Sequence, residues 1–484
     1  MSERSELNTM DDSTIAAIAT PGGRGGIGII KISGPRAVLI ATAIFSPAEQ
    51  QSTLNSGNRS SPKTATGDGF QSNRLTYGHI IYPDTGRIVD EVLLSVMKAP
   101  RSYTREDVVE INAHGGQLAL NAILELVCKH GARIAEPGEF TQRAFLNGRI
   151  DLTQAEAVID IINARTDKSL QVATAQVNGK LRSSVDQIRE FLIDLLTRAE
   201  GAIDFPDDVE DLAQPQRTAA EIQARVIKPL RTLIRYHVDG RTLRDGLKVA
   251  IIGRPNVGKS SLINCLVQKE RAIVTAMPGT TRDTIDEALN INGYSVILTD
   301  TAGLHDTLDP IETLGIEKTI ENLNGADLVL FMVEANCPVT AEDHSVFERI
   351  RSKPMIIAKN KIDLINGDDI CKLPVDWGDI DYVNTSALYD RGIDRLKERI
   401  IEAAYGKDPL DLDTVIVPNL RQKLLLEESI ESAEAIYREL KSGTPMELVA
   451  IFLQEAIDSL GQILGTNVKV DLLDQIFSRF CIGK

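Results

Sequence analysis

Residues 247–270 read LKVAIIGRPNVGKSSLINCLVQKE, and this stretch decides the fold. Its first six residues are largely apolar and predict a short buried strand, whereas the spacing of SSLINCLV predicts a helix. The loop between them has the pattern G-x-x-x-x-G-K-S. In that setting the backbone N–H groups of the loop and the positive end of the helix face phosphate groups. The stretch therefore predicts a doubly wound α/β domain that binds a nucleotide.

Each residue type in this loop has a reason. Gly253 and Gly258 let the backbone turn inward, and Lys259 can bridge the β- and γ-phosphates, which makes it the predicted catalytic lysine. The Ser260 hydroxyl is a ligand for Mg²⁺. We predict nucleotide contacts from Asn256, Val257, Gly258, Lys259, Ser260 and Ser261. A chance match, or a strained loop with no ligand, is disfavoured by the strand and helix on either side.

The next motifs follow in the order that a GTPase requires. Thr281, within GTTRD at 279–283, offers a second hydroxyl to Mg²⁺. After the strand-like run YSVILT comes DTAG, whose first carboxylate reaches Mg²⁺ and whose glycine N–H faces the γ-phosphate. This motif adds Asp300, Thr301, Ala302 and Gly303 to the predicted site.

Two later motifs select the base. Asn360-Lys361-Ile362-Asp363 follows the run MIIAKN, and the Asp363 carboxylate can accept hydrogen bonds from guanine N1–H and its exocyclic amine. Adenine would leave that carboxylate unpaired, which is costly in a buried site. Ser386-Ala387 supplies a backbone N–H for guanine O6. Four such motifs in order predict GTP as the nucleotide.

The hydrolytic group is not fixed by these motifs. Leu304 stands after DTAG, where small regulatory GTPases place a water-orienting Gln. Five nearby side chains are alternatives for orienting the water, namely His305, Asp306, Asp309, Glu312 and Glu317. Arg254 and Arg282 are each as compatible with a structural role as with an arginine finger. Asn256 raises a further possibility, because a side-chain amide in the loop can help hold a monovalent cation that supplies the missing positive charge.

Composition bounds the rest of the chain. With 484 residues the chain is long enough for about three domains. A net charge of −16 disfavours indiscriminate nucleic-acid binding but leaves room for local basic patches. Five scattered cysteines without a C-x-x-C pair predict neither zinc nor disulfides. No long apolar run predicts a signal or membrane span, so we expect a cytoplasmic protein with no membrane contact.

The chain is expected to be a multidomain α/β protein. An α+β region with strand-like runs such as TIAAIAT, GIGIIKIS and EVLLSVM comes first, interrupted by a polar loop from about Ser46 to Arg74. Helical spacing governs 153–203 and 216–244, and returns at 419–441, 446–464 and 471–480. We therefore predict an all-α domain built from two segments with the nucleotide domain inserted. The predicted domains are 1–148, 149–245, 246–407 and 408–484. The glycine-rich stretch 23–28 fits G-x-G-x-x-G, but a strand-like run follows it, so a dinucleotide fold is rejected.

Taken together, these motifs resemble one family. GRPNVGKSS, PGTTRD, DTAGLH, NKID and SA are similar to GTPases that carry a hydrophobic residue in place of the catalytic Gln. The segments TIAAIATPGGRGGIGIIKISGP, AHGG, PGEFTQRAFLNGRIDLTQAEAV, AIDFP and the terminal FCIGK resemble the tRNA-modifying MnmE (TrmE) GTPases, of the TrmE-Era-EngA-like superfamily. The likeness spans nearly the whole chain, except for 46–74.

The resemblance implies an activity, partners and cation ligands. Members are cytoplasmic homodimers that act with the FAD-dependent flavoprotein MnmG. Together they install an aminomethyl or carboxymethylaminomethyl group on C5 of the wobble uridine of certain tRNAs. Potassium-dependent dimerisation activates their G domains. Carried over, the K⁺ site comprises Asn256, Thr275, Met277 and Thr280, where Met277 acts through its backbone, and Thr275 and Thr280 also belong to the nucleotide site. Ser260 and Thr281 hold Mg²⁺, and Glu312 orients the attacking water.

The resemblance also implies a folate site in the N-terminal domain, completed by the chain terminus. The one-carbon donor is 5,10-methylene- or 5-formyl-tetrahydrofolate, and the matching positions are Lys31, Glu110, Arg149 and Lys484. The family pattern has Arg at position 31 and Lys at 149, so bidentate geometry is lost at one position and gained at the other. Cys481 either takes part in the one-carbon chemistry or packs beside it. Two other functions stay open: a regulatory GTPase that controls ribosome or partner assembly, and a scaffold that binds GTP without hydrolysing it.

Overall fold

The chain forms two compact units, one of residues 1–159 with 464–484 and one of residues 160–463. The computed structural model describes residues 13–23, 25–48, 70–204, 215–270, 287–299, 325–365, 371–406 and 416–484. Within those ranges, none of the helices combines the length and the apolar character that a membrane crossing needs. All five cysteines are free thiols.

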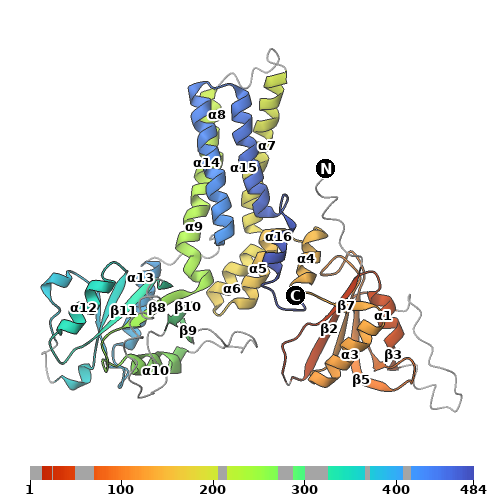
Figure 1. Ribbon diagram of the computed structural model, residues 1–484, viewed down its shortest axis with the longest axis horizontal. Helices are drawn as coiled ribbons and strands as arrows, with labels where there is room; N and C mark the ends of the chain where they lie inside the picture. The colour runs from red at the N-terminus through yellow and green to blue at the C-terminus, as the bar shows by residue number, and fades with distance from the viewer. Residues whose placement is uncertain are drawn as a thin grey trace. The chain divides into compact units, whose positions relative to one another are not determined.

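The first unit is built on a seven-stranded sheet in the order β3-β4-β5-β6-β2-β1-β7 (Figure 1). Its strands are antiparallel neighbours except for β1 and β7, which run parallel. Their bounds are β1 (Thr14–Ile18), β2 (Ile27–Ser33), β3 (Phe45–Pro47), β4 (Arg74–Ile81), β5 (Ile88–Met97), β6 (Val108–His114) and β7 (Ala132–Ile134).

Helices α1 (Ala37–Ile44) and α3 (Gln117–Lys129) cover one face of this sheet and complete its apolar core. Gly28 is needed where α3 crosses β2, because a Cβ there would lie 2.5 Å from the Leu120 side chain. Alternation along the strands sends the remaining side chains to the opposite face. Lys31 and Glu110 stand there on paired positions of β2 and β6.

A small helical cluster completes the first unit. Helix α4 (Glu139–Leu146), the first part of α5 (Leu152–Asn163) and α16 (Val470–Phe477) belong to it, and apolar residues of α5 and α16 share one core. Phe477 and Phe480 are buried in this cluster. The end of the chain is thus anchored just before its last four residues.

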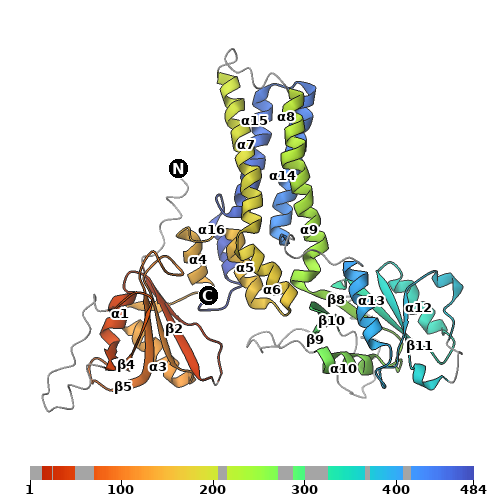
Figure 2. The ribbon, with the colours of Figure 1, turned by 180° about the vertical axis from the view of Figure 1, so that it is seen from behind.

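The helical part of the second unit joins segments far apart in sequence. It contains α6 (Asp167–Val177), α7 (Lys180–Asp204), α8 (Pro215–Ile222), a π-helical turn η4 (Gln223–Ile227), α9 (Lys228–Asp245), α14 (Leu420–Ser442) and α15 (Met446–Leu464). Helix α14 packs against α8 and α9, and Figures 1 and 2 show it beside them from both sides. This packing confirms that an all-α domain is formed by two segments.

A six-stranded sheet lies between those two segments in the chain. Its order is β13-β12-β11-β8-β10-β9, and every neighbouring pair is parallel except β10 with β9. The strands are β8 (Leu247–Ile252), β9 (Glu287–Ile291), β10 (Tyr294–Thr299), β11 (Leu328–Glu334), β12 (Met355–Asn360) and β13 (Tyr382–Asn384). Helices α10 (Lys259–Glu270) and α13 (Ile393–Tyr405) pack on one face and α12 (Ala341–Ile350) on the other, which confirms the doubly wound α/β fold.

Some local predictions were wrong. Helix α1 was missed, because seven of its eight residues are apolar and the sequence shows no helical period of polar positions. The polar loop begins later and ends earlier than predicted, since Ser46 lies in β3 and Arg74 in β4; most of its length, 49–69, falls outside the described residues. The strand predicted after the glycine-rich stretch is present as β2, which confirms that the stretch does not open a dinucleotide fold.

Candidate functional site

The phosphate-binding loop joins β8 to α10, as its sequence predicted. Asn256 and Gly258 both have left-handed backbones, with φ of 64° and 101°. A Cβ on Gly258 would collide with the amide group of Asn360, so both the backbone angle and the space require glycine there. The loop is therefore shaped by its glycine and by a contact from the far end of β12.

Lys259 and the two serines stand at the start of α10. The Lys259 ammonium donates to the carbonyl oxygens of Gly253 at 2.7 Å and Arg254 at 2.9 Å, so it lies back over the loop. Ser260 and Ser261 are exposed in the first helical turn. The first turn of a helix attracts anions through its N–H groups and dipole. Cation and hydroxyl groups thus surround the expected phosphate position.

Asn360 ties the two ends of the predicted nucleotide site together. It is 2% exposed, and its amide nitrogen donates to the Val257 carbonyl at 2.8 Å. Its amide oxygen accepts from the Ala387 N–H at 3.0 Å and from the Thr385 hydroxyl at 3.4 Å. One side chain therefore connects the phosphate loop to the Ser386-Ala387 loop.

The residues predicted to select the base converge on the same edge of the sheet. Lys361 adopts a left-handed backbone with φ of 66°, after which Asp363 follows in a short 3₁₀ turn. The Ser386 hydroxyl donates to the Asp363 carboxylate. That bond orients one carboxylate oxygen and leaves lone pairs for a base edge.

Arg254 is committed to a structural ion pair. Its guanidinium contacts Glu334 at 2.6 Å, and Lys361 also pairs with Glu334. Burial alone would raise the pKa of Glu334, but hydrogen bonds from Lys361 and Cys337, with the charges of Lys361 and Arg254, bring it below its ordinary value. Glu334 is therefore a partly buried anion that connects two motifs, a role that no sequence pattern indicated.

The remaining predicted nucleotide and cation residues lie outside the described part of the chain. These are Thr275, Met277, Thr280, Thr281, Asp300, Thr301, Ala302, Gly303 and Glu312. Their roles stay predictions.

The four residues predicted for the folate site belong to the first unit. Lys31 pairs in register with Glu110, and its ammonium lies 3.5 Å from the Gly483 carbonyl oxygen. Burial lowers the pKa of Lys31, the charge of Glu110 opposes this, and the charge of Lys484 adds to it. Lys31, Glu110 and the chain terminus are thus brought together on the face of the sheet that α1 and α3 leave open.

Tyr103 links Lys31 to Arg149. The Lys31 ammonium lies 5.5 Å from the Tyr103 ring centre, and the Arg149 guanidinium lies 4.6 Å from the same centre. Arg149 also donates to the Tyr103 carbonyl oxygen at 2.9 Å. Phe140 contributes a second ring 5.3 Å from the Lys31 ammonium. Sequence reasoning missed both aromatic residues. The only signal available for Tyr103 was its position shortly before β6, the strand that carries Glu110.

The chain end is held by a glycine. Gly483 has a φ of 93°, and a Cβ there would lie 2.8 Å from the Ala19 Cα. Cys481 is exposed and Phe480 is buried. The terminus therefore packs along β1, although Cys481 does not enter the core.

Comparison with known proteins decides the family. A family described as GTP-binding protein TrmE N-terminus matches residues 14–149, and one described as MnmE helical domain matches 152–481. The chain is 43% identical over 476 residues to the tRNA modification GTPase MnmE of Carboxydothermus hydrogenoformans, covering 98% of this chain and 100% of that protein. The chain belongs to the MnmE family. The MnmE of Moorella thermoacetica is 44% identical over 480 residues, with the same two shares, and that of Staphylococcus haemolyticus 40% over 477 residues, again with the same shares. The resemblance drawn from the motifs is confirmed, and with it the assignment to an enzyme family of GTPases.

Proposed function

We propose that this MnmE-family chain hydrolyses GTP to GDP and phosphate at the 253–387 site and uses that cycle in tRNA modification. The proposal rests on the position of Asn360, whose hydrogen bonds hold the phosphate loop and the Ser386-Ala387 loop at one fixed spacing. Three hydrogen bonds from one buried side chain hold both loops in place, and this arrangement suits a ligand that contacts both loops at once.

For hydrolysis, we assign the groups by what each can do. Lys259 neutralises charge between the β- and γ-phosphates, and Asp363 with Ala387 selects guanine. Ser260 and Thr281 are proposed to hold Mg²⁺, which supplies positive charge to the phosphates when bound. Glu312 is proposed to orient the attacking water, since Leu304 cannot.

Potassium is the proposed source of the remaining positive charge. Arg254 is engaged by Glu334 and so is unsuited to act as an arginine finger. Asn256, in contrast, stands exposed at the turn of the loop, where an amide oxygen suits a monovalent cation. Thr275, Met277 and Thr280 would complete the K⁺ site.

The N-terminal unit is proposed to bind a tetrahydrofolate derivative through Lys31, Glu110, Arg149 and Lys484. A folate carries carboxylates and a flat ring system, which fit a partly desolvated ammonium beside an aromatic ring. The bound folate would supply the one-carbon unit. With MnmG as flavoprotein partner, a homodimer of this chain would then modify C5 of the wobble uridine. We keep the division into domains 1–148, 149–245, 246–407 and 408–484 as part of this proposal.

GTP turnover in KCl and in NaCl tests the nucleotide mechanism. We expect K⁺ to accelerate hydrolysis and Glu312→Ala to abolish turnover while nucleotide binding persists. Equal rates in both salts would reject the cation role, and unchanged turnover in the Glu312 variant would assign the water to another acid.

The alternative is a regulatory GTPase without folate chemistry. It would hydrolyse GTP equally well, so reduced-folate binding to the full chain separates the two. No folate binding, with GTP turnover intact, would favour the regulatory function.

A further inference from the structure

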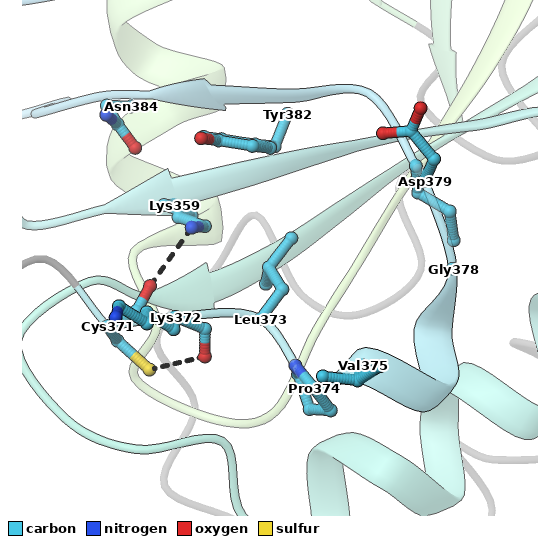
Figure 3. A pocket seen from close by; sticks show the side chains of 11 residues that line it. Lys359, Cys371, Lys372, Leu373, Pro374, Val375, Gly378, Asp379, Tyr382 and Asn384 are labelled. Atoms are coloured by element: carbon cyan, nitrogen blue, oxygen red, sulfur yellow. Dashed lines mark hydrogen bonds between the residues drawn. The ribbon is translucent and has the colours of Figure 1, made fainter.

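A cavity with both polar and apolar walls lies beside the nucleotide site, on the α12 face of the six-stranded sheet. It has a volume of about 520 Å³ and is walled by the ends of β12 and β13 and by the segment 371–380. Figure 3 shows Lys359 between the strand that carries Tyr382 and Asn384 and the segment that carries Cys371 and Pro374. The volume is typical of small-molecule sites, which run from about 300 to 1,000 Å³.

Lys359 forms the cationic floor of this cavity. It is 5% exposed, and its ammonium donates to the Cys371 carbonyl at 3.0 Å and lies 4.0 Å from the Tyr382 ring centre. Among the described residues no carboxylate is paired with it. Burial lowers the pKa of Lys359, and Cys371 opposes that shift. A buried ammonium that has one carbonyl and one ring as partners retains N–H groups suited to an anion.

Asn384 places a hydrogen-bond acceptor without a donor beside Lys359. It is the direct neighbour of Lys359 across the strand pair, and its side-chain oxygen is buried with no hydrogen-bond partner. Buried acceptors without donors are rare in folded proteins and call for an explanation such as a ligand. The cavity also presents apolar wall from Leu373, Pro374 and Ile380.

We propose that this cavity binds a small organic carboxylate that carries an N–H or O–H donor next to its carboxylate and an apolar tail. The carboxylate pairs with Lys359, the donor satisfies the Asn384 oxygen, and the tail lies on the apolar wall. No covalent step is involved. The site is separate from the phosphate loop and does not depend on how GTP is hydrolysed.

The cavity has a direct connection to base recognition. The Thr385 N–H donates to the Lys359 carbonyl at 2.8 Å, and the Thr385 hydroxyl donates to Asn360 at 3.4 Å. Lys359 immediately precedes Asn360, and Asn384 immediately precedes Thr385. Occupancy of the cavity is therefore expected to change guanine-nucleotide affinity.

The proposal is tested by measuring binding of N-acetyl-L-leucine to the full chain by calorimetry and ligand-observed NMR. We expect saturable binding with a Kd of about 1 mM, the weak affinity usual for a ligand of this size. Two matched compounds each lack one feature: N-acetyl-L-leucinamide has no carboxylate, and 4-methylpentanoate has no N–H donor. Each should bind about tenfold more weakly. No saturable binding by the parent compound up to about 10 mM, or equal binding by all three, overturns the proposal.

Three variants locate the ligand. Lys359→Met and Asn384→Ala should each weaken binding about tenfold, whereas Lys372→Met, at the exposed rim, should leave it unchanged. Unchanged GDP binding and an unchanged thermal unfolding midpoint show that a variant is folded. If either Lys359→Met or Asn384→Ala fails to fold, the other still tests the proposal. Loss of binding only in the Lys372 variant would reject the assignment to Lys359.

Discussion

In both the nucleotide site and the Lys31 site a lysine ammonium donates to backbone carbonyls, but the separation in sequence between the lysine and those carbonyls differs greatly. Lys259 donates to carbonyls five and six residues away, within its own loop. Lys31 lies against the carbonyl of Gly483, which is 452 residues away along the chain. Closing a short loop costs little entropy, whereas bringing distant segments together depends on the whole unit. The first site is therefore a property of a motif and the second a property of a fold.

The two sites also differ in how charge is balanced. Around the nucleotide loop, Glu334 is paired with Arg254 and Lys361, so the anion there is already compensated. In the first unit the charge of Lys31 is not fully compensated, because burial and the charge of Lys484 lower its pKa by more than the charge of Glu110 raises it. A site of the second kind gains most from a bound anion.

The largest effect is expected for Asn360→Ala, which removes the side chain that connects the phosphate loop to the Ser386-Ala387 loop. This change removes the partner of the Val257 carbonyl and of the Ala387 N–H in a buried place, whereas the Thr385 hydroxyl keeps the Lys359 carbonyl at 3.5 Å as an acceptor. We expect a loss of about 2 kcal/mol in the free energy of unfolding of the nucleotide domain, at roughly 1 kcal/mol for each of the two unsatisfied groups. GDP affinity should fall about 100-fold.

Urea unfolding and GDP titration measure these two quantities. Ser345→Ala, on the exposed side of α12, is the matched control and should change neither. An Asn360 variant with normal GDP affinity would show that the two loops hold their spacing without this side chain.

The same contrast explains what could be predicted from the sequence. The phosphate loop, the Asn360 motif and the Ser386-Ala387 pair could be predicted because the chemistry of a nucleotide site requires a fixed spacing along the chain, and the structure brings these three segments together. Alternating and helical periods likewise predicted most strands and helices. Helix α1 escaped because seven of its eight residues are apolar, including the exposed Leu39, so its sequence shows no alternation of polar and apolar positions to detect.

Residues that act across long separations were not predictable from residue patterns. Glu334 ends an apolar strand and looks like an ordinary surface acid until the fold places Arg254 and Lys361 beside it. Tyr103 gains its place between Lys31 and Arg149 only through the sheet. The residues predicted for the folate site were named from family resemblance, since nothing in their spacing connects position 31 with position 484.

A middle-sized effect is expected at the chain end. Gly483→Ala forces a side chain into a left-handed backbone and against Ala19, at a cost of about 1–2 kcal/mol locally. The terminus should detach from β1, and reduced-folate binding should weaken about tenfold while GTP turnover persists. Equilibrium folate binding measures the change. Ile482→Ala, one residue earlier and exposed, is the control and should bind folate normally. Equal binding by both variants would remove the terminus from the site.

The smallest effect concerns the charge of Lys31. Because its pKa is lowered in the folded chain, there is a pH window below the ordinary value of 10.5 in which the unfolded chain holds a proton that the folded chain has released. Stability rises with pH wherever the unfolded state binds more protons, so Lys31 makes the first unit more stable as pH increases through that window. Binding of an anionic folate has the opposite trend, since it needs the ammonium and weakens as pH rises past the lowered pKa. Lys31→Arg keeps its charge throughout this range and should flatten the binding curve. Folate titrations from neutral pH to the ordinary lysine pKa, on both proteins, compare the slopes. Parallel curves would show that Lys31 is not the group whose titration weakens binding.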